Sequence, residues 1–261
     1  MDQICFDTRR PRPTRLANKN CCYSNDRVHA IDLKEFDALE WTDFQVIFTI
    51  SGCTAEYDQQ VYYLPAALNC LLDQAYDGIE FLPGVIYFAS RNAERLDTDG
   101  LLVATSDALE SCFRTWTERF EVLHFDEAAC KAKGWQIRHF DYVRNTEAVS
   151  ELLDLLVRHS SLQVVAERMV RYLVRADHRP EDSAWLLEIA KAARDGASYY
   201  SFEYPDTKSK LVPANASEIQ HILMNRDLLQ REFNHTKDAP IRKDTCEMYW
   251  NGLADELGLA V

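Results

Sequence analysis

Apolar residues recur at helical spacing over much of the chain, most clearly in its second half. The ranges 145–157, 162–173 and 181–195 each carry apolar side chains three and four positions apart. Three such segments with short breaks between them predict an antiparallel helical bundle. Two more helices are expected after it, beginning at Asn215 and at Asp244.

Helices are also predicted in the first half. In YYLPAALNCLLD, Pro65 suits a first helical turn, because its missing N–H needs no partner there. Apolar positions from Leu68 to Ala75 then form one stripe, and Gly78 lies just beyond it. We therefore expect one helix that begins at Pro65, and another from Asp107 to about residue 120.

The segment from Asp32 to Gly52 is ambiguous. Leu33 and Phe36 begin a series of apolar residues near helical spacing, while FQVIFTIS is apolar on both faces. Such a run fits either a buried strand or a helix, and we favour a helix.

A second Leu-Pro pair predicts a small β element. Pro83-Gly84 is a typical turn pair, and it lies between IEFL and VIYFAS, which are rich in β-branched and aromatic residues. Residues 135–143 are a candidate partner strand, and residues 200–204 alternate as in a strand or an extended aromatic loop. The expected class is α+β, predominantly helical, with a small antiparallel β element and a C-terminal helical bundle.

Composition suggests three parts in this chain of 261 residues. Residues 1–25 are expected to be a flexible basic N-terminal arm, because residues 1–20 hold five basic residues against two acidic ones. A change near residue 145 separates a mixed α/β subdomain, 26–145, from a helical subdomain, 146–261.

The net charge of −13 limits the classes of partner. Residues 1–20 carry +3, which leaves −16 on the rest of the chain. An acidic body repels nucleic acid and membrane phosphate, and it attracts basic partners by electrostatic steering. We expect neither a nucleic-acid nor a membrane partner. Solubility alone is the alternative explanation of the charge.

The chain shows no signal for export or membrane insertion. Its apolar runs are shorter than the roughly 20 residues of a membrane helix, and its N-terminus lacks the apolar stretch of a secretory signal. A cytoplasmic location is therefore expected. The eight cysteines should be reduced there, including the adjacent Cys21 and Cys22.

Motifs of common active sites are missing. The sequence has no glycine-rich phosphate loop, HExxH, CxxC or G-x-S-x-G. The most metal-like set has spacings that match no common site; it comprises Cys112, His124, Cys130 and His139. A Cys–His nucleophile pair within that set stays open, because folding could bring the two residues together. Charged residues from Glu167 to Arg175 are expected to form a solvated helix face. We expect no catalytic residue, cofactor or metal.

The segment YYLPAALNCLLD, with Phe44–Phe48 upstream and LESCFRTWTERF downstream, resembles uncharacterised bacterial proteins with a Tyr-Leu-Pro-Ala helix start. Some of those proteins are encoded beside polymorphic toxins and are thought to be immunity proteins. The resemblance rests on the motif from Tyr63 to Ala66, whose residues look structural, so it carries over no catalytic role.

Charge and resemblance together favour a binding function. The resemblance implies a cytosolic immunity protein that neutralises a cognate toxin with a basic surface by direct occlusion, and an acidic surface that associates fast suits this role. The expected contacts are exposed acids and aromatics between structural elements: Asp97, Asp99, Glu203, Tyr204 and Asp206. Two alternatives stay open, namely an enzyme with an active site of dispersed residues and a helical scaffold or adaptor in a bacterial complex.

Overall fold

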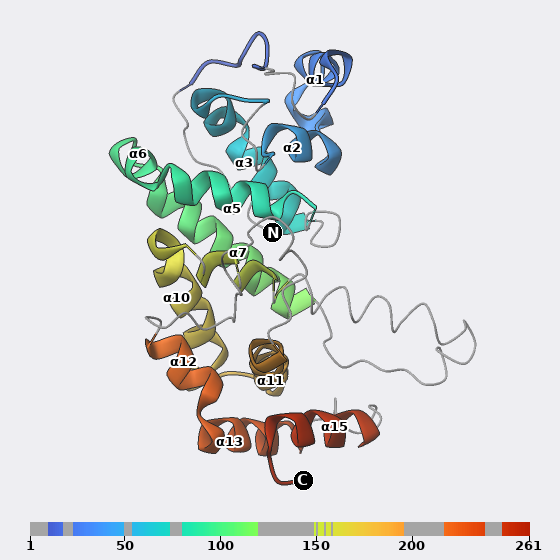
Figure 1. Cartoon of the computed structure of the whole chain (residues 1–261), viewed down its shortest axis with the longest axis vertical. Coiled ribbons are helices and arrows are strands. Elements are labelled where there is room, and N and C mark those ends of the chain that lie inside the picture. Colours follow the sequence, from blue (N-terminus) through green and yellow to red (C-terminus); the bar gives the residue numbers. More distant parts are fainter. Residues whose placement is uncertain are drawn as a thin grey trace, which may run out of the picture. The chain divides into compact units, whose positions relative to one another are not determined.

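The structure is a computed structural model, and its described residues form helices without a strand (Figure 1). The described residues are 10–17, 23–49, 54–73, 80–119, 149, 151–153, 155–157, 159–195, 217–237 and 247–261. The predicted predominance of helix is confirmed, whereas the predicted α+β class with an antiparallel β element is wrong for these residues. The expected strand segments 135–143 and 200–204 lie outside them.

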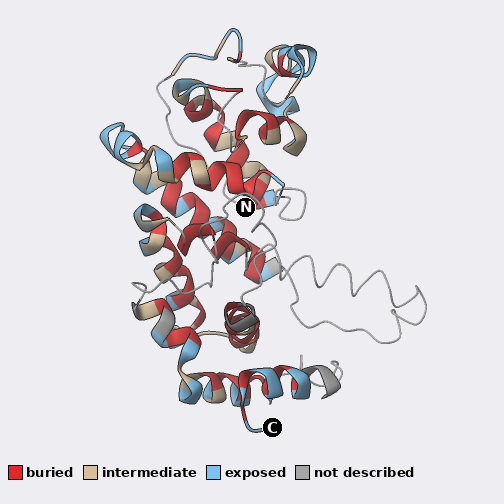
Figure 2. Ribbon diagram, viewed as in Figure 1, coloured by how far each residue is buried: buried red, intermediate tan, exposed pale blue. Residues whose placement is uncertain are grey.

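The chain divides into two compact units, Met1–Cys112 and Phe113–Val261. The division falls within helix α7 (Leu102–Arg119). The composition change near residue 145 lies outside the described residues. Buried residues occur along the helices of both units (Figure 2).

The first unit is built around one long helix, α3 (Tyr57–Asp73), which contacts α2 and α5. Its remaining elements, in chain order, are α1 (Asn25–Asp32), the 3₁₀ turn η1 (Phe36–Ala38), α2 (Trp41–Ile47), α5 (Leu82–Arg91), α6 (Ala93–Thr98) and the first part of α7. Helix α2 covers the first four residues of the apolar run beginning at Phe44, so the preference for helix is confirmed for residues 44–47.

Helix α3 begins at Tyr57, so the predicted start at Pro65 is wrong. Pro65 lies inside the helix, where its ring removes one backbone hydrogen bond. The predicted apolar stripe is nevertheless buried, since Leu68 and Leu71 have no exposed surface. Burial of this helix face offsets the free-energy cost of the proline inside the helix. Pro65 therefore does not mark the start of the helix, as its local preference had suggested.

The Pro83-Gly84 pair opens helix α5 and does not form the predicted turn. Pro83 occupies the first helical turn, and the aliphatic Val85 and Ile86 are fully buried on the helix. Gly84 faces the end of α2 so closely that an added Cβ would lie 1.5 Å from the carbonyl oxygen of Phe48. The glycine therefore serves close helix packing, and burial overrides the local β preference of the neighbouring residues.

Part of the N-terminal arm is bound to the first unit. The Arg10 guanidinium donates to Asp58 and to Asp99, each at 2.7 Å. The backbone N–H of Leu16 donates to an Asp32 carboxylate oxygen at 2.8 Å, and Leu16 is 2% exposed. Residues 10–17 thus follow the surface of the unit through defined contacts.

The second unit is organised around α11 (Pro180–Asp195), which contacts α10, α12, α13 and α15. These elements are α10 (Gln163–Leu173), α12 (Ser217–Met224), α13 (Arg226–Lys237) and α15 (Glu247–Leu257), with η2 (Ser160–Leu162) before α10. Trp185 is fully buried, and its indole N–H donates to the carbonyl of Thr117 at 3.1 Å. Helices predicted at 162–173 and 181–195 are confirmed. Among the described helices, none is both long and apolar enough to cross a membrane.

Candidate functional site

The predicted contact residues are only partly within the described chain. Asp97 lies exposed on α6, and Asp99 caps the end of the same helix. Glu203, Tyr204 and Asp206 lie outside the described residues, so the structure brings together only the first two.

Asp99 belongs to a polar cluster with basic groups. Its carboxylate accepts hydrogen bonds from the Tyr57 hydroxyl and from Arg10, each at 2.7 Å. The Arg95 guanidinium lies over the Tyr57 ring, 3.7 Å from its centre. The hydrogen bond from Tyr57 and the charge of Arg10 hold the pKa of Asp99 below its ordinary value. The negative charge of Asp99 is thus already opposed by arginine.

A second surface combines exposed apolar and acidic residues in the link between α1 and α2. We name residues 33–40 the Leu33–Glu40 turn. Leu33 is 72% exposed and Phe36 is 41% exposed, and Glu35, Asp37 and Glu40 are exposed beside them. The sequence pattern had suggested a helix face here, but only the 3₁₀ turn η1 forms.

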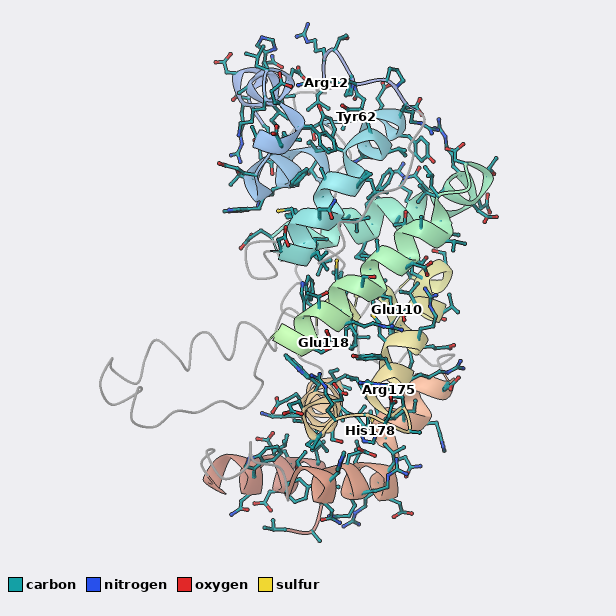
Figure 3. The ribbon with its side chains drawn as sticks, turned by 180° about the vertical axis from the view of Figure 1, so that it is seen from behind. Arg12, Tyr62, Glu110, Glu118, Arg175 and His178 are labelled. Carbon is teal, nitrogen blue, oxygen red and sulfur yellow. The ribbon has the colours of Figure 1, made fainter. Side chains whose placement is uncertain are left out.

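Phe36 is held in place by aromatic neighbours. Its ring stacks with Tyr63 at 6.4 Å between centroids and meets the edge of Tyr62 at 5.6 Å. Figure 3 labels Tyr62. Lys34 pairs with the buried Asp43 at 2.7 Å, and Glu40 forms a capping box with Asp43 at the start of α2. The turn is therefore fixed to α2 and α3.

The second unit contains a compact cluster of titratable groups that the sequence did not reveal. We call His178, Ser183, Glu232 and His235 the histidine–carboxylate cluster. His178 precedes α11, Ser183 lies in its first turns, and Glu232 and His235 lie one turn apart on α13. The contact of α11 with α13 brings these residues together. Figure 3 labels His178 of this cluster.

Glu232 is the centre of this cluster. Its Oε2 accepts from the Ser183 hydroxyl and from His178 Nε2, both at 2.6 Å, and its Oε1 accepts from Arg231 at 2.7 Å. The carboxylate is 1% exposed. Burial by itself would raise the pKa of Glu232, but the hydrogen bonds from Ser183, Arg231 and His178 outweigh it and place the pKa below its ordinary value.

The connectivity of the cluster does not suit a serine nucleophile. Ser183 is fully buried and gives its proton to Glu232, while His235 Nδ1 lies 3.0 Å from the same hydroxyl oxygen. A nucleophilic serine needs an accessible oxygen whose proton goes to a base, with a third group behind that base. The arrangement is better suited to holding a cation, because ligand atoms of His178, Glu232 and His235 all lie within 4.8 Å of one another.

A buried ion pair adjoins the cluster. Asp182 has no exposed side-chain surface, and its carboxylate pairs with Arg175 and Arg179, each at 2.9 Å. The same side chain accepts from the backbone N–H of Arg179 at 2.9 Å and so caps α11. The charged residues after Glu167 are thus only partly a solvated face, because Arg175 lies against a buried acid.

The cysteine and histidine set noted in the sequence is largely outside the described chain. His124, Cys130 and His139 lie there. Cys112 is fully buried, its Sγ lies 3.6 Å from the Leu68 carbonyl, and burial raises the pKa of its thiol above the ordinary value. An unreactive thiol is expected of such a position.

Comparison of this chain with protein-family models, curated proteins and solved structures finds no match. The resemblance to proteins with a Tyr-Leu-Pro-Ala helix start therefore stays a prediction from sequence. In the structure Tyr63 and Leu64 are buried on α3, as packing residues are.

Proposed function

We propose that the protein binds a partner protein with a basic surface, and that this partner is a toxin that it neutralises by occlusion. The observation that carries the proposal is the net charge of −13. A charge of this size accelerates encounter with an oppositely charged protein, which is what an inhibitor of a toxin requires.

The Leu33–Glu40 turn is the contact surface that we propose. Large apolar side chains that are exposed and held rigidly supply most of the binding energy in protein interfaces, while acids around them steer the partner. Leu33 and Phe36 provide the exposed apolar surface, and aromatic neighbours hold Phe36 in place. Asp37 and Glu40 lie exposed beside them, whereas Arg12 partly opposes the charge of Glu35 through an ion pair at 3.3 Å. The aromatic support under Phe36 reduces the entropy that binding would cost.

Asp97 and Asp99 take a lesser part in this proposal. Arg10 opposes the charge of Asp99, so this acid offers a basic partner less attraction than its exposure suggests. Asp97 lies two positions earlier on α6 and contributes to the acidic exterior.

The test begins with affinity capture of the tagged full chain from its native host, followed by mass spectrometry. The captured partner is then purified, and its association rate is measured at increasing salt. The rate should fall steeply with ionic strength, and the partner should show toxicity that the full chain suppresses.

Surface variants locate the contact. Leu33→Ser and Phe36→Ser should each weaken binding by about 30-fold, which corresponds to about 2 kcal/mol at an interface hot spot. Val103→Ser is the matched control, because Val103 is an equally exposed aliphatic residue of the same unit at 67%. Capture of housekeeping proteins alone would count against the toxin. An affinity that the two variants leave unchanged would count against the turn.

A further inference from the structure

We propose that His178, Glu232 and His235 bind one divalent transition-metal ion, with zinc as the best fit. This site is independent of the partner-binding function proposed above. Two imidazoles and one carboxylate are a ligand set that suits zinc, and three protein ligands leave a fourth position for water.

The ligand atoms are already close together. His178 Nε2 lies 2.6 Å and His235 Nδ1 lies 4.0 Å from Glu232 Oε2. The two histidine rings meet edge to face, with centroids 4.8 Å apart. Two ligand atoms that each lie about 2.0–2.2 Å from a tetrahedral zinc ion are about 3.3 Å apart. Small side-chain rotations therefore convert the observed arrangement into a metal site.

The groups around the ligands orient them in the way that metal sites require. His178 Nδ1 lies 2.5 Å from the carbonyl oxygen of Arg175, so this nitrogen carries the proton and Nε2 faces the centre of the cluster. The Ser183 hydroxyl, on α11, donates to the Glu232 carboxylate and so fixes the orientation of this ligand. Metal-binding histidines usually make such a bond to a backbone carbonyl with their other nitrogen.

Binding exchanges one proton for the ion. In the metal-free arrangement one proton joins His178 Nε2 and Glu232 Oε2 across their 2.6 Å contact. An incoming ion binds His178 Nε2, and the proton between the two atoms leaves to water. On His235 the proton that Nδ1 shares with the Ser183 oxygen moves to Nε2, so that Nδ1 can bind the ion. Access is through His235, which is 39% exposed, whereas His178 is 14% exposed and Glu232 is 1% exposed.

Arg231 is the group that opposes the ion. Its guanidinium pairs with Glu232 Oε1 at 2.7 Å, and it is 65% exposed. The side chain can therefore swing into water when a cation binds, but its positive charge lowers the affinity while it stays. Arg231→Gln should consequently bind the metal more tightly than the natural chain, by about tenfold if the pair contributes about 1.4 kcal/mol.

The experiment titrates Co²⁺ into the full chain after removal of metals with a chelator, under reducing conditions. One equivalent should bind and give the visible absorption of cobalt held by nitrogen and oxygen, without a thiolate-to-cobalt charge-transfer band. Zn²⁺ should displace it. His235→Gln removes a ligand and should weaken binding by about 100-fold. Loss of a residue that only supports a ligand already costs up to about 100-fold in metal affinity. His221→Gln, an exposed histidine on α12 in the same unit, should bind like the natural chain.

The proposed metal site is contradicted if the natural chain binds no cobalt, or if a thiolate-to-cobalt band shows that cysteines hold the ion. It is equally wrong if His235→Gln, shown by circular dichroism to be folded, binds cobalt unchanged. Arg231→Gln gives a second check, because weaker binding by this variant would contradict the proposed position of the ion.

Discussion

Replacement of Gly84 by alanine tests the packing that distinguishes the observed helix α5 from the predicted turn. An added Cβ would lie 1.5 Å from the Phe48 carbonyl oxygen and 2.7 Å from the carbonyl carbon. Real Cβ atoms essentially never come within 3.0 Å of another heavy atom. Both clashing atoms belong to backbone, so no side chain can rotate away, and α5 would have to retreat by at least 1.5 Å from the end of α2.

The retreat loosens a helix whose Leu82, Val85 and Ile86 have no exposed surface. Overpacking of this kind costs about 1–3 kcal/mol, and the rigid backbone on both sides places Gly84→Ala at the upper limit, about 3 kcal/mol. For a unit of this size that loss lowers the melting temperature by about 12 °C or more.

The assay is urea unfolding of the full chain, followed by circular dichroism at increasing denaturant. Gly252→Ala is the matched control, because Gly252 also lies inside a helix but its added Cβ meets nothing within 4 Å. That variant should be more stable by about 0.4–1 kcal/mol. If Gly84→Ala is as stable as the natural chain, then α5 does not pack on the Phe48 carbonyl and the close approach is refuted.

Three further predictions concern ionisable groups. Burial raises the pKa of Tyr63 from 10.0 to about 12, so the folded state holds this proton more tightly. The contribution of Tyr63 to the free energy of unfolding should be constant below pH 10 and fall by about 3 kcal/mol from pH 10 to 12, and Tyr63→Phe should remove this contribution. Ser183→Ala removes a hydrogen bond to the buried Glu232 and should lower the free energy of unfolding in urea by about 2 kcal/mol; a loss below about 0.5 kcal/mol would contradict the contact. Cys112 should resist iodoacetamide in the folded chain and react after unfolding, as mass spectrometry of its peptide would show, whereas rapid reaction of the folded chain would contradict its burial.

The sequence predicts helices well where an apolar stripe and its burial coincide. Helices α10 and α11 follow their stripes, because a sustained period of 3.6 residues has no strand equivalent. Local signals are less informative in the first unit. Pro65 and the Pro83-Gly84 pair were interpreted through their own preferences, while their surroundings decide the outcome: a buried helix face around one, and the Phe48 carbonyl against the other.

The histidine–carboxylate cluster shows a different limit of sequence reasoning. His178 and Glu232 are 54 positions apart, and only the contact of α11 with α13 joins them. One local signal was present, since a glutamate and a histidine three positions apart on a helix share a face. No sequence spacing links His178 to this pair, so the complete cluster could be found only from the structure. For Leu33 and Phe36, helical spacing indicated burial, but the chain turns there and leaves them exposed.

Arg175 restricts how this protein can change by mutation. Its guanidinium lies 3.9 Å from the centre of the Tyr172 ring while it pairs with Asp182. A flat, delocalised cation can cover the ring and meet the carboxylate together, whereas the compact ammonium of lysine can serve one of them at a time. A change from arginine to lysine has little effect on stability at many surface positions. Here it would weaken the pairing of the buried Asp182 carboxylate. Arg175→Lys should therefore destabilise the second unit even though the chain's total charge would stay the same.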